Sequence, residues 1–282
     1  MKAVKKGINQ WCYPPETTLD DVLKWTKAAG FEAIELNVSQ PGGIGLTMET
    51  SPAEAKQIKQ AIAAHGLETD SLSTALLWEF PLSSADSAIQ EEGKRIVRKM
   101  LELASAIEAS TILVVPGVVT KETPYDVCYQ NSIAALRSLL PYAEELGVAI
   151  GIENVWNRFL LSPLEMKTYI DSLQSEYVGA YFDVGNVLPF GYPEQWIRIL
   201  GKRILKVHVK DFKETIGNIN GFTNLLAGDV DFKSVIAELK AIGYNGEVTA
   251  ELTPYKEHPF ALAYDTARQL DVLLGRHSLV SL

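Results

Sequence analysis

The sequence predicts one closed (β/α)8 barrel of the α/β class, a TIM barrel, over residues 1–282 as a single domain. Short β-rich runs alternate eight times with amphipathic runs of helical length. The length of 282 residues is near the roughly 250 typical of such barrels. An open doubly wound sheet is the alternative, but it usually carries a Gly-rich phosphate turn after the first strand. Here that strand leads into Trp-Cys-Tyr-Pro-Pro, so the barrel is favoured.

The predicted strands are short runs rich in β-branched and apolar residues. In chain order they end near Trp11, Asn37, Thr74, Pro116, Glu153, Asp183, His208 and Glu251. The predicted helices between them are Leu19–Ala29, a helix beginning at Pro52, Ile89–Ile107, Asp126–Leu146, a helix beginning at Pro163, Pro193–Leu200, a helix following Asp231, and Pro259–Leu274.

Local signals mark the limits of several of these helices. The segment Ser51-Pro52-Ala-Glu54 combines an N-cap serine, a proline at the first helical position and a capping-box glutamate, and Gly66 ends that helix. The segment Ser162-Pro163-Leu-Glu165 repeats this arrangement after the fifth strand. Asp231 is the expected cap of the seventh helix, and Gly243 ends it.

Composition excludes several classes of function. The net charge is −9 without a basic block, which argues against nucleic acid because its binding depends on neutralising phosphates. No apolar run approaches the roughly 20 residues of a membrane span. The first residues, Met-Lys-Ala-Val-Lys-Lys, do not match a secretion signal, and Cys12 and Cys128 are expected to be reduced thiols. A cytoplasmic location is therefore expected.

Four side chains of metal-binding types end the last four predicted strands: Glu153, Asp183, His208 and Glu251. Side chains alternate across a strand, so the residues two apart share a face. In each of these strands the apolar residues form one face, and the metal-binding residue shares the other with small or polar residues. This pattern predicts that all four point into the barrel at its carboxyl-terminal mouth, where barrel active sites lie.

Three carboxylates converging there would repel one another and be poorly solvated, so a cation must balance them. Lys206 and Lys210 are expected to supply part of the charge. One divalent ion bound by three carboxylates and one imidazole balances it better. Such an oxygen and nitrogen ligand set suits Mn²⁺, which we expect, and also Mg²⁺ or Co²⁺, with Zn²⁺ as a further option. The alternative is that the four are unrelated helix caps or salt bridges.

At these residues the chain resembles the xylose-isomerase-like barrel superfamily of sugar isomerases and epimerases. The resemblance is carried by Ile-Glu153-Asn, Phe-Asp183-Val-Gly-Asn186, Val-His208-Val-Lys-Asp211 and Ala-Glu251. It covers essentially the whole barrel and is strongest toward the ketose 3-epimerases, including the L-ribulose- and L-xylulose-5-phosphate 3-epimerases. DNA-repair endonucleases of this fold bind a zinc cluster with many histidines. This chain has only four histidines, and it has Asn186 where those enzymes have one.

The resemblance implies a metal-dependent epimerase or isomerase acting on a small-molecule sugar or sugar phosphate. The expected reaction is 3-epimerisation of a ketose through a metal-stabilised enediolate. Glu153 and Glu251 would be both ligands and the acid/base pair, whereas Asp183 and His208 would be ligands only. The asparagine at position 186 favours a phosphorylated or otherwise modified substrate. Relatives of this kind form homodimers or homotetramers.

Three other functions stay open at this stage. They are a hydroxypyruvate or aldose–ketose isomerase, an inosose-type dehydratase on the same site, and a non-catalytic sugar-binding barrel. The expected substrate-contacting residues are Asn186, Arg158, Lys210, Glu35, Asn37 and Trp11. Asp211 is expected to orient a neighbouring group, and the His208 ring requires a partner for its free ring N–H.

Overall fold

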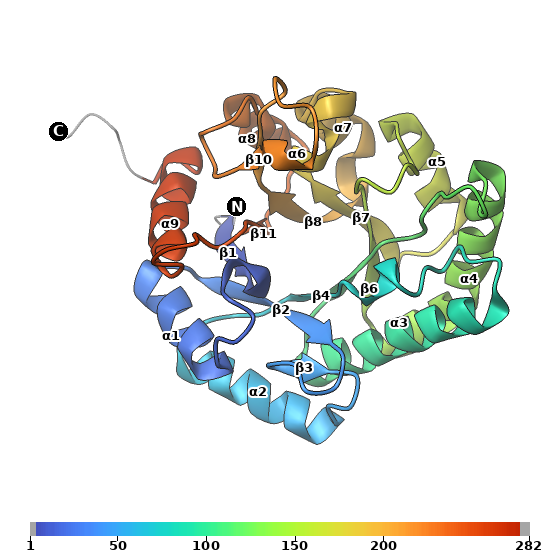
Figure 1. The fold of residues 1–282 in the computed structure, drawn as a ribbon, viewed down its shortest axis with the longest axis horizontal. Coiled ribbons are helices and arrows are strands. Elements are labelled where there is room, and N and C mark those ends of the chain that lie inside the picture. The colour runs from blue at the N-terminus through green and yellow to red at the C-terminus, as the bar shows by residue number, and fades with distance from the viewer. Residues whose placement is uncertain (1–3, 277–282) are drawn as a thin grey trace.

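Eight parallel strands close into a barrel in the computed structural model, which describes residues 4–276 (Figure 1). The barrel strands are β1 (Lys5–Asn9), β2 (Ala33–Ser39), β4 (Ser71–Ser73), β5 (Thr111–Val114), β6 (Ala149–Glu153), β7 (Val178–Asp183), β8 (Ile204–Val209) and β11 (Glu247–Ala250). They hydrogen-bond in the order β1-β11-β8-β7-β6-β5-β4-β2, and pairing of β1 with β2 closes the sheet. The predicted TIM barrel is confirmed.

Helices surround this sheet and connect its strands (Figure 1). The outer helices are α1 (Leu19–Ala29), α2 (Pro52–Ala64), α3 (Ser87–Ile107), α4 (Tyr125–Leu146), α5 (Pro163–Ser172), α7 (Pro193–Leu200), α8 (Phe232–Ala241) and α9 (Ala261–Leu273). The limits predicted for five of them agree with these within two residues. None of the helices within residues 4–276 combines the length and the apolar character needed to cross a membrane.

Short elements at the carboxyl-terminal ends of the strands complete the mouth. The strand β3 (Leu46–Thr47) continues the sheet beside β2. One helical turn, α6 (Val184–Val187), follows β7 directly. The strands β9 (Asp211–Phe212) and β10 (Phe222–Thr223) form an antiparallel pair in the segment between β8 and α8. These elements lie outside the regular alternation and were not predicted.

The helix caps show which local signals act as expected. At α2 the Ser51 side chain accepts the Glu54 N–H, and the Glu54 carboxylate accepts the Ser51 N–H, so the capping box forms. At α5 the Ser162 side chain accepts the Glu165 N–H at 3.2 Å. The Glu165 carboxylate accepts the Tyr125 hydroxyl instead of the Ser162 N–H, so the box predicted there is only half formed.

The strand faces agree with the predicted alternation. Ile150 and Ile152 are fully buried in the core, and Gly151 between them occupies the interior face of β6. A Cβ at Gly151 would lie 2.9 Å from the Tyr181 ring, closer than real Cβ contacts allow. The glycine therefore makes room for Tyr181 in the interior layer beneath the end of β6, where Glu153 lies.

Candidate metal centre

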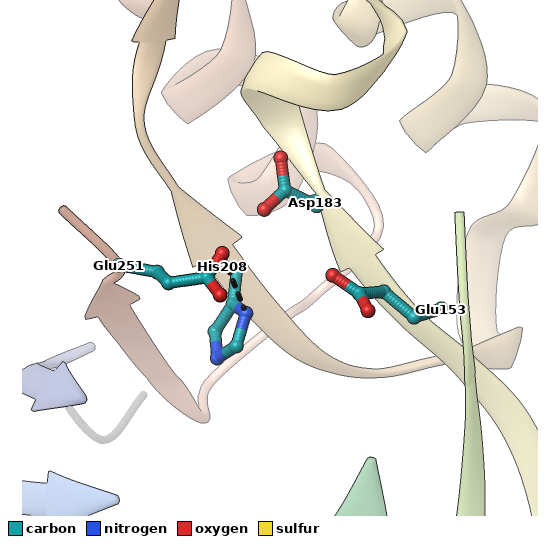
Figure 2. Close-up of side chains that lie close together, drawn as sticks. All are labelled: Glu153, Asp183, His208 and Glu251. Atoms are coloured by element: carbon teal, nitrogen blue, oxygen red, sulfur yellow. Dashed lines mark ion pairs between the residues drawn. The ribbon is translucent and has the colours of Figure 1, made fainter. Parts of the chain in front are cut away.

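The four predicted ligands converge at the mouth of the barrel. Glu153, Asp183, His208 and Glu251 each offer one ligand atom, and these atoms lie within 4.8 Å of one another. Their strands are successive neighbours in the sheet, in the order β6, β7, β8 and β11. Figure 2 shows the Glu153 and Glu251 carboxylates reaching inward from opposite sides, with Asp183 and His208 between them.

Local backbone chemistry fixes the orientation of Asp183. Its Oδ1 caps α6 by accepting the Asn186 N–H at 2.8 Å. The side chain of Asn154 bridges β6 and β7, because it accepts the Asp183 N–H at 2.9 Å and donates to the Asp183 carbonyl at 2.7 Å. The second oxygen, Oδ2, is left facing the cluster, 2.9 Å from Lys210 Nζ.

The His208 ring is oriented from below. Its Nε2 lies 2.7 Å from Glu35 Oε1, and its Nδ1 is buried with no hydrogen-bond partner among the described residues. That Nδ1 lies 3.7 Å from Glu251 Oε2. A histidine that ligates a metal through one ring nitrogen usually donates its other N–H to a carboxylate, which fixes the tautomer. The Glu35–His208 pair has this arrangement.

Glu35 was predicted to contact the substrate, but it lies buried in the barrel interior beside the His208 ring. It is 1% exposed, and its oxygens also accept Asn9, Ser71 and the Tyr181 hydroxyl. Four side chains inside the barrel thus share the two Glu35 oxygens, and the geometry favours orientation of His208 over contact with a substrate.

Two further predicted neighbours also lie away from the cluster. Asn37 belongs to the same buried interior layer, where it pairs with Asn9 and Ser73. The carboxylate of Asp211 accepts the backbone N–H groups of the β8–α8 segment, including that of Gly228 at 2.9 Å and that of Val230 at 3.1 Å. Asp211 organises that loop, and the partner of the His208 ring is Glu35 instead.

The two lysines expected to balance the carboxylates lie at opposite ends of the barrel. Lys210 Nζ is 2.5 Å from Glu251 Oε2 and 2.9 Å from Asp183 Oδ2, so its ammonium lies within the cluster. Lys206 pairs instead with Asp70 and lies 4.0 Å from Glu247 at the amino-terminal end. The expectation that Lys206 neutralises the metal-site carboxylates was wrong, because each step of two residues along a strand moves a side chain one layer along the barrel, and Lys206 lies four residues before Lys210.

The cluster suits a divalent cation. The His208 Nδ1 atom is buried and has no hydrogen-bond partner among the described residues, and Asp183 Oδ2 in the same cluster is paired with Lys210. Burying an unpartnered ring nitrogen is unfavourable unless a ligand or ion satisfies it. Bonds of roughly 2.0–2.2 Å to nitrogen and oxygen ligands require only small side-chain shifts from the observed separations. The four residues could therefore hold one ion, and Mn²⁺ stays the predicted metal.

Burial and neighbouring charges shift the pKa values of these groups. Burial, followed by the charge of Glu251, raises the pKa of Glu153 to about 8. Burial also opposes ionisation of Glu251, but Lys210 and His208 outweigh it and hold the Glu251 pKa below its usual range. Burial would lower the pKa of His208, but the Glu35 carboxylate more than offsets this and raises it to about 9. The two catalytic candidates thus differ in protonation at neutral pH.

Metal binding is expected to release protons. In the metal-free protein at pH 7, Glu153 and His208 are protonated, whereas ligation requires a carboxylate and a neutral imidazole. The dissociation constant should fall by up to about tenfold per pH unit for each proton released, and level off above pH 9. Calorimetric titration of Mn²⁺ in buffers of different ionisation enthalpy measures both effects. A dissociation constant unchanged between pH 6 and 9 would contradict this electrostatic account.

A cavity of about 790 Å³ opens above the cluster. Three predicted substrate contacts line it: Trp11, Asn186 and Lys210. Arg158 does not line it; it is exposed, with a left-handed backbone at φ 61°. The residues that sequence reasoning missed include Ile219, Phe222 and Tyr255, which lie in the segments that follow β8 and β11. These segments have no periodic pattern, so no sequence signal pointed to the three residues.

The fold and this site define the class of TIM barrels with a candidate metal centre in the carboxyl-terminal mouth. The chain matches the family described as the xylose isomerase-like TIM barrel over residues 23–273. It therefore belongs to that family.

Individual relatives are distant. The chain is 25% identical over 262 residues to L-ribulose-5-phosphate 3-epimerase UlaE of Salmonella paratyphi C (strain RKS4594), covering 89% of this chain and 88% of UlaE. Its structure is similar to that of L-ribulose 3-epimerase (TM-score 0.80, 20% identity, 97% and 95% of the two chains covered). It is also similar to D-psicose 3-epimerase (TM-score 0.76, 16% identity, 96% and 100% covered). These relatives are named as sugar epimerases. At sequence identities of 16–20%, the similarity to the two solved structures shows a shared fold and no more than that.

Proposed function

We propose that the protein is a metal-dependent epimerase that inverts C3 of a ketose, with Glu153 and Glu251 as its acid/base pair. The observation that carries this proposal is the placement of the two glutamates. They extend from β6 and β11, which β7 and β8 separate, so their carboxylates approach the centre from opposite sides (Figure 2). Inversion at carbon requires removal of a proton from one face and delivery of a proton to the other, which two opposed groups can perform.

The two carboxyl groups would divide the proton transfer between them. One accepts the C3 proton on one face of the substrate, and the other delivers a proton to the opposite face. In the reverse direction the two exchange roles. A divalent ion, when bound, supplies a Lewis acid that stabilises negative charge on the substrate oxygens.

The other residues hold the substrate and the pair in place. Lys210 lies beside Glu251 and over the Phe222 ring, 5.2 Å from its centroid, so its ammonium faces the space above the cluster. Asn186 and Trp11 line the same cavity. We propose these three as substrate contacts. Asp183 and His208 would be ligands only, with Glu35 holding the imidazole in its tautomer.

Proton exchange at C3 tests this function. Incubation of a ketose and ketose-phosphate panel with the Mn²⁺-loaded protein in D₂O should replace the C3 proton with deuterium and yield the C3 epimer, both detected by NMR. Exchange at C1 or C2 alone would instead indicate an aldose–ketose or hydroxypyruvate isomerase. Release of water to give a deoxy-dicarbonyl product would indicate a dehydratase. Binding without any exchange would indicate a non-catalytic barrel.

Assembly and location stay predictions. A homodimer or homotetramer is expected from the resemblance, and light scattering of the purified protein measures it. The cytoplasmic location expected from the cysteines is tested by fractionation of cells expressing the chain.

A further inference from the structure

The cavity above the metal centre continues well beyond the candidate ligands. Its base contains Glu251 and Lys210, and its outer part contains Trp78 and Ile219, whose exposed fractions are 44% and 65%. Its volume of about 790 Å³ lies in the upper part of the roughly 300–1,000 Å³ range of sites that enclose drug-sized ligands. A single sugar ring bound at the metal centre would leave the outer part filled with water.

The walls of this outer part are apolar and aromatic. Trp156 packs against Phe222 with ring centroids 4.9 Å apart, and its Nε1–H donates to the Asn186 carbonyl at 2.9 Å, so this wall is fixed in place. Trp78 and Ile219 present apolar surface to solvent beside it. Exposed apolar side chains gathered at a cavity commonly mark a ligand site. The apolar C–H faces of a sugar ring pack well against such aromatic surfaces.

The charges in this cavity do not suit a phosphate ester. A phosphate group carries about −1.5 to −2 charges at neutral pH and is usually held by arginine, lysine or backbone N–H groups. Among the described residues that line the cavity there is no arginine, and the lysines are Lys210 and Lys256. Lys210 lies at the base of the cavity beside Asp183 and Glu251, where its proposed contact is the ketose end of the substrate. In the outer part the one lysine among the described lining residues is Lys256, which is exposed and followed by Glu257.

We propose that the substrate is a ketose carrying a neutral substituent, such as a second sugar ring, and that this substituent lies against the outer aromatic wall. The proposal rests on the proposed function, because it assumes that the ketose end binds at the metal centre. It departs from the phosphorylated substrate that Asn186 favoured and that the name of UlaE carries.

Three matched ketoses test the proposal: fructose, fructose 6-phosphate and 6-O-glucosyl-fructose. They share one reacting centre and differ only in the substituent on O6. With the Mn²⁺-loaded protein in D₂O, kcat/KM for C3 exchange should be at least about tenfold higher for the glucosyl compound than for fructose, a difference of 1.4 kcal/mol. Fructose 6-phosphate should be no better than fructose.

The outcomes separate this inference from the proposed function. Preference for fructose 6-phosphate, or equal rates for all three, would overturn the inference while leaving 3-epimerisation intact. Absence of C3 exchange from all three would contradict the proposed reaction on this ketose, and the inference with it.

Two variants and one control locate the substituent. Trp78→Ala should reduce the glucosyl-to-fructose ratio of kcat/KM by about tenfold, since it removes an aromatic surface from the outer wall. Tyr192→Ala is the matched control, because Tyr192 is an aromatic residue that is 63% exposed and lies outside the cavity lining. Lys256→Met should leave the order of the three substrates unchanged. An unchanged ratio in Trp78→Ala, or loss of a phosphate preference in Lys256→Met, would refute the placement.

Discussion

Replacing Glu251 with glutamine is expected to lower the rate of epimerisation by at least about 10³-fold while metal is retained. General acid or base catalysis by a positioned side chain contributes about 10²–10⁴-fold, and the amide can neither accept nor return the proton. The amide oxygen can still serve as a ligand, and the other three candidate ligands are unchanged. Glu153→Gln should lose epimerisation to a similar extent, because inversion needs both groups.

The two variants should differ in the partial reaction that each retains. With one acid/base group left, each protein should exchange the C3 proton in D₂O for only one of the two epimers, and the two variants should retain opposite epimers. Glu257→Gln is the control, since Glu257 is exposed in the same loop. NMR follows exchange and inversion, and metal analysis of the purified variants checks occupancy. A turnover rate within tenfold of the parent protein would show that the replaced glutamate is not an acid/base group of the reaction.

Replacing Glu35 with leucine is expected to cause the largest loss of stability, about 3–5 kcal/mol, because it breaks a buried charged pair by removing one partner. Burial opposes ionisation of Glu35, but His208 beside it offsets this and holds the pKa at about 2, so the carboxylate is charged at neutral pH. Leucine would leave His208 Nε2, the Tyr181 hydroxyl and the Ser71 hydroxyl without their shared acceptor.

Thermal unfolding and metal titration measure the two consequences. The Tm of the metal-free Glu35→Leu protein should fall by roughly 6–20 °C, and loss of the partner that orients His208 should weaken metal binding about 10–100-fold. Glu35→Gln keeps an amide acceptor and should show smaller changes of both kinds. Glu16→Leu, at an exposed glutamate, is the control for lost surface charge. Normal metal affinity in Glu35→Leu would show that His208 needs no orientation from below.

Much of the arrangement follows from local patterns. The fold class and five sets of helix limits were predictable because apolar periodicity and caps depend on a few neighbouring residues. The convergence of Glu153, Asp183, His208 and Glu251 was predictable for a similar reason. Each ends a parallel strand with the same parity, and parallel strands of a closed sheet end at one mouth. The functions of the four as ligands and acid/base groups remain predictions for the experiments above.

The sequence by itself thus determined the barrel and the faces on which its polar side chains lie. Only the tertiary structure decided which groups from distant strands meet at the same level. Glu35 reaches His208 across 173 residues of sequence, and Lys210 joins the cluster while Lys206 lies at the opposite end of the barrel. Strand alternation specifies the face of the sheet on which each side chain lies. The height of a side chain along the barrel axis depends on how neighbouring strands are staggered, and the sequence of a single strand does not specify that stagger. The loops that wall the cavity have no repeating geometry, so their positions come from packing alone.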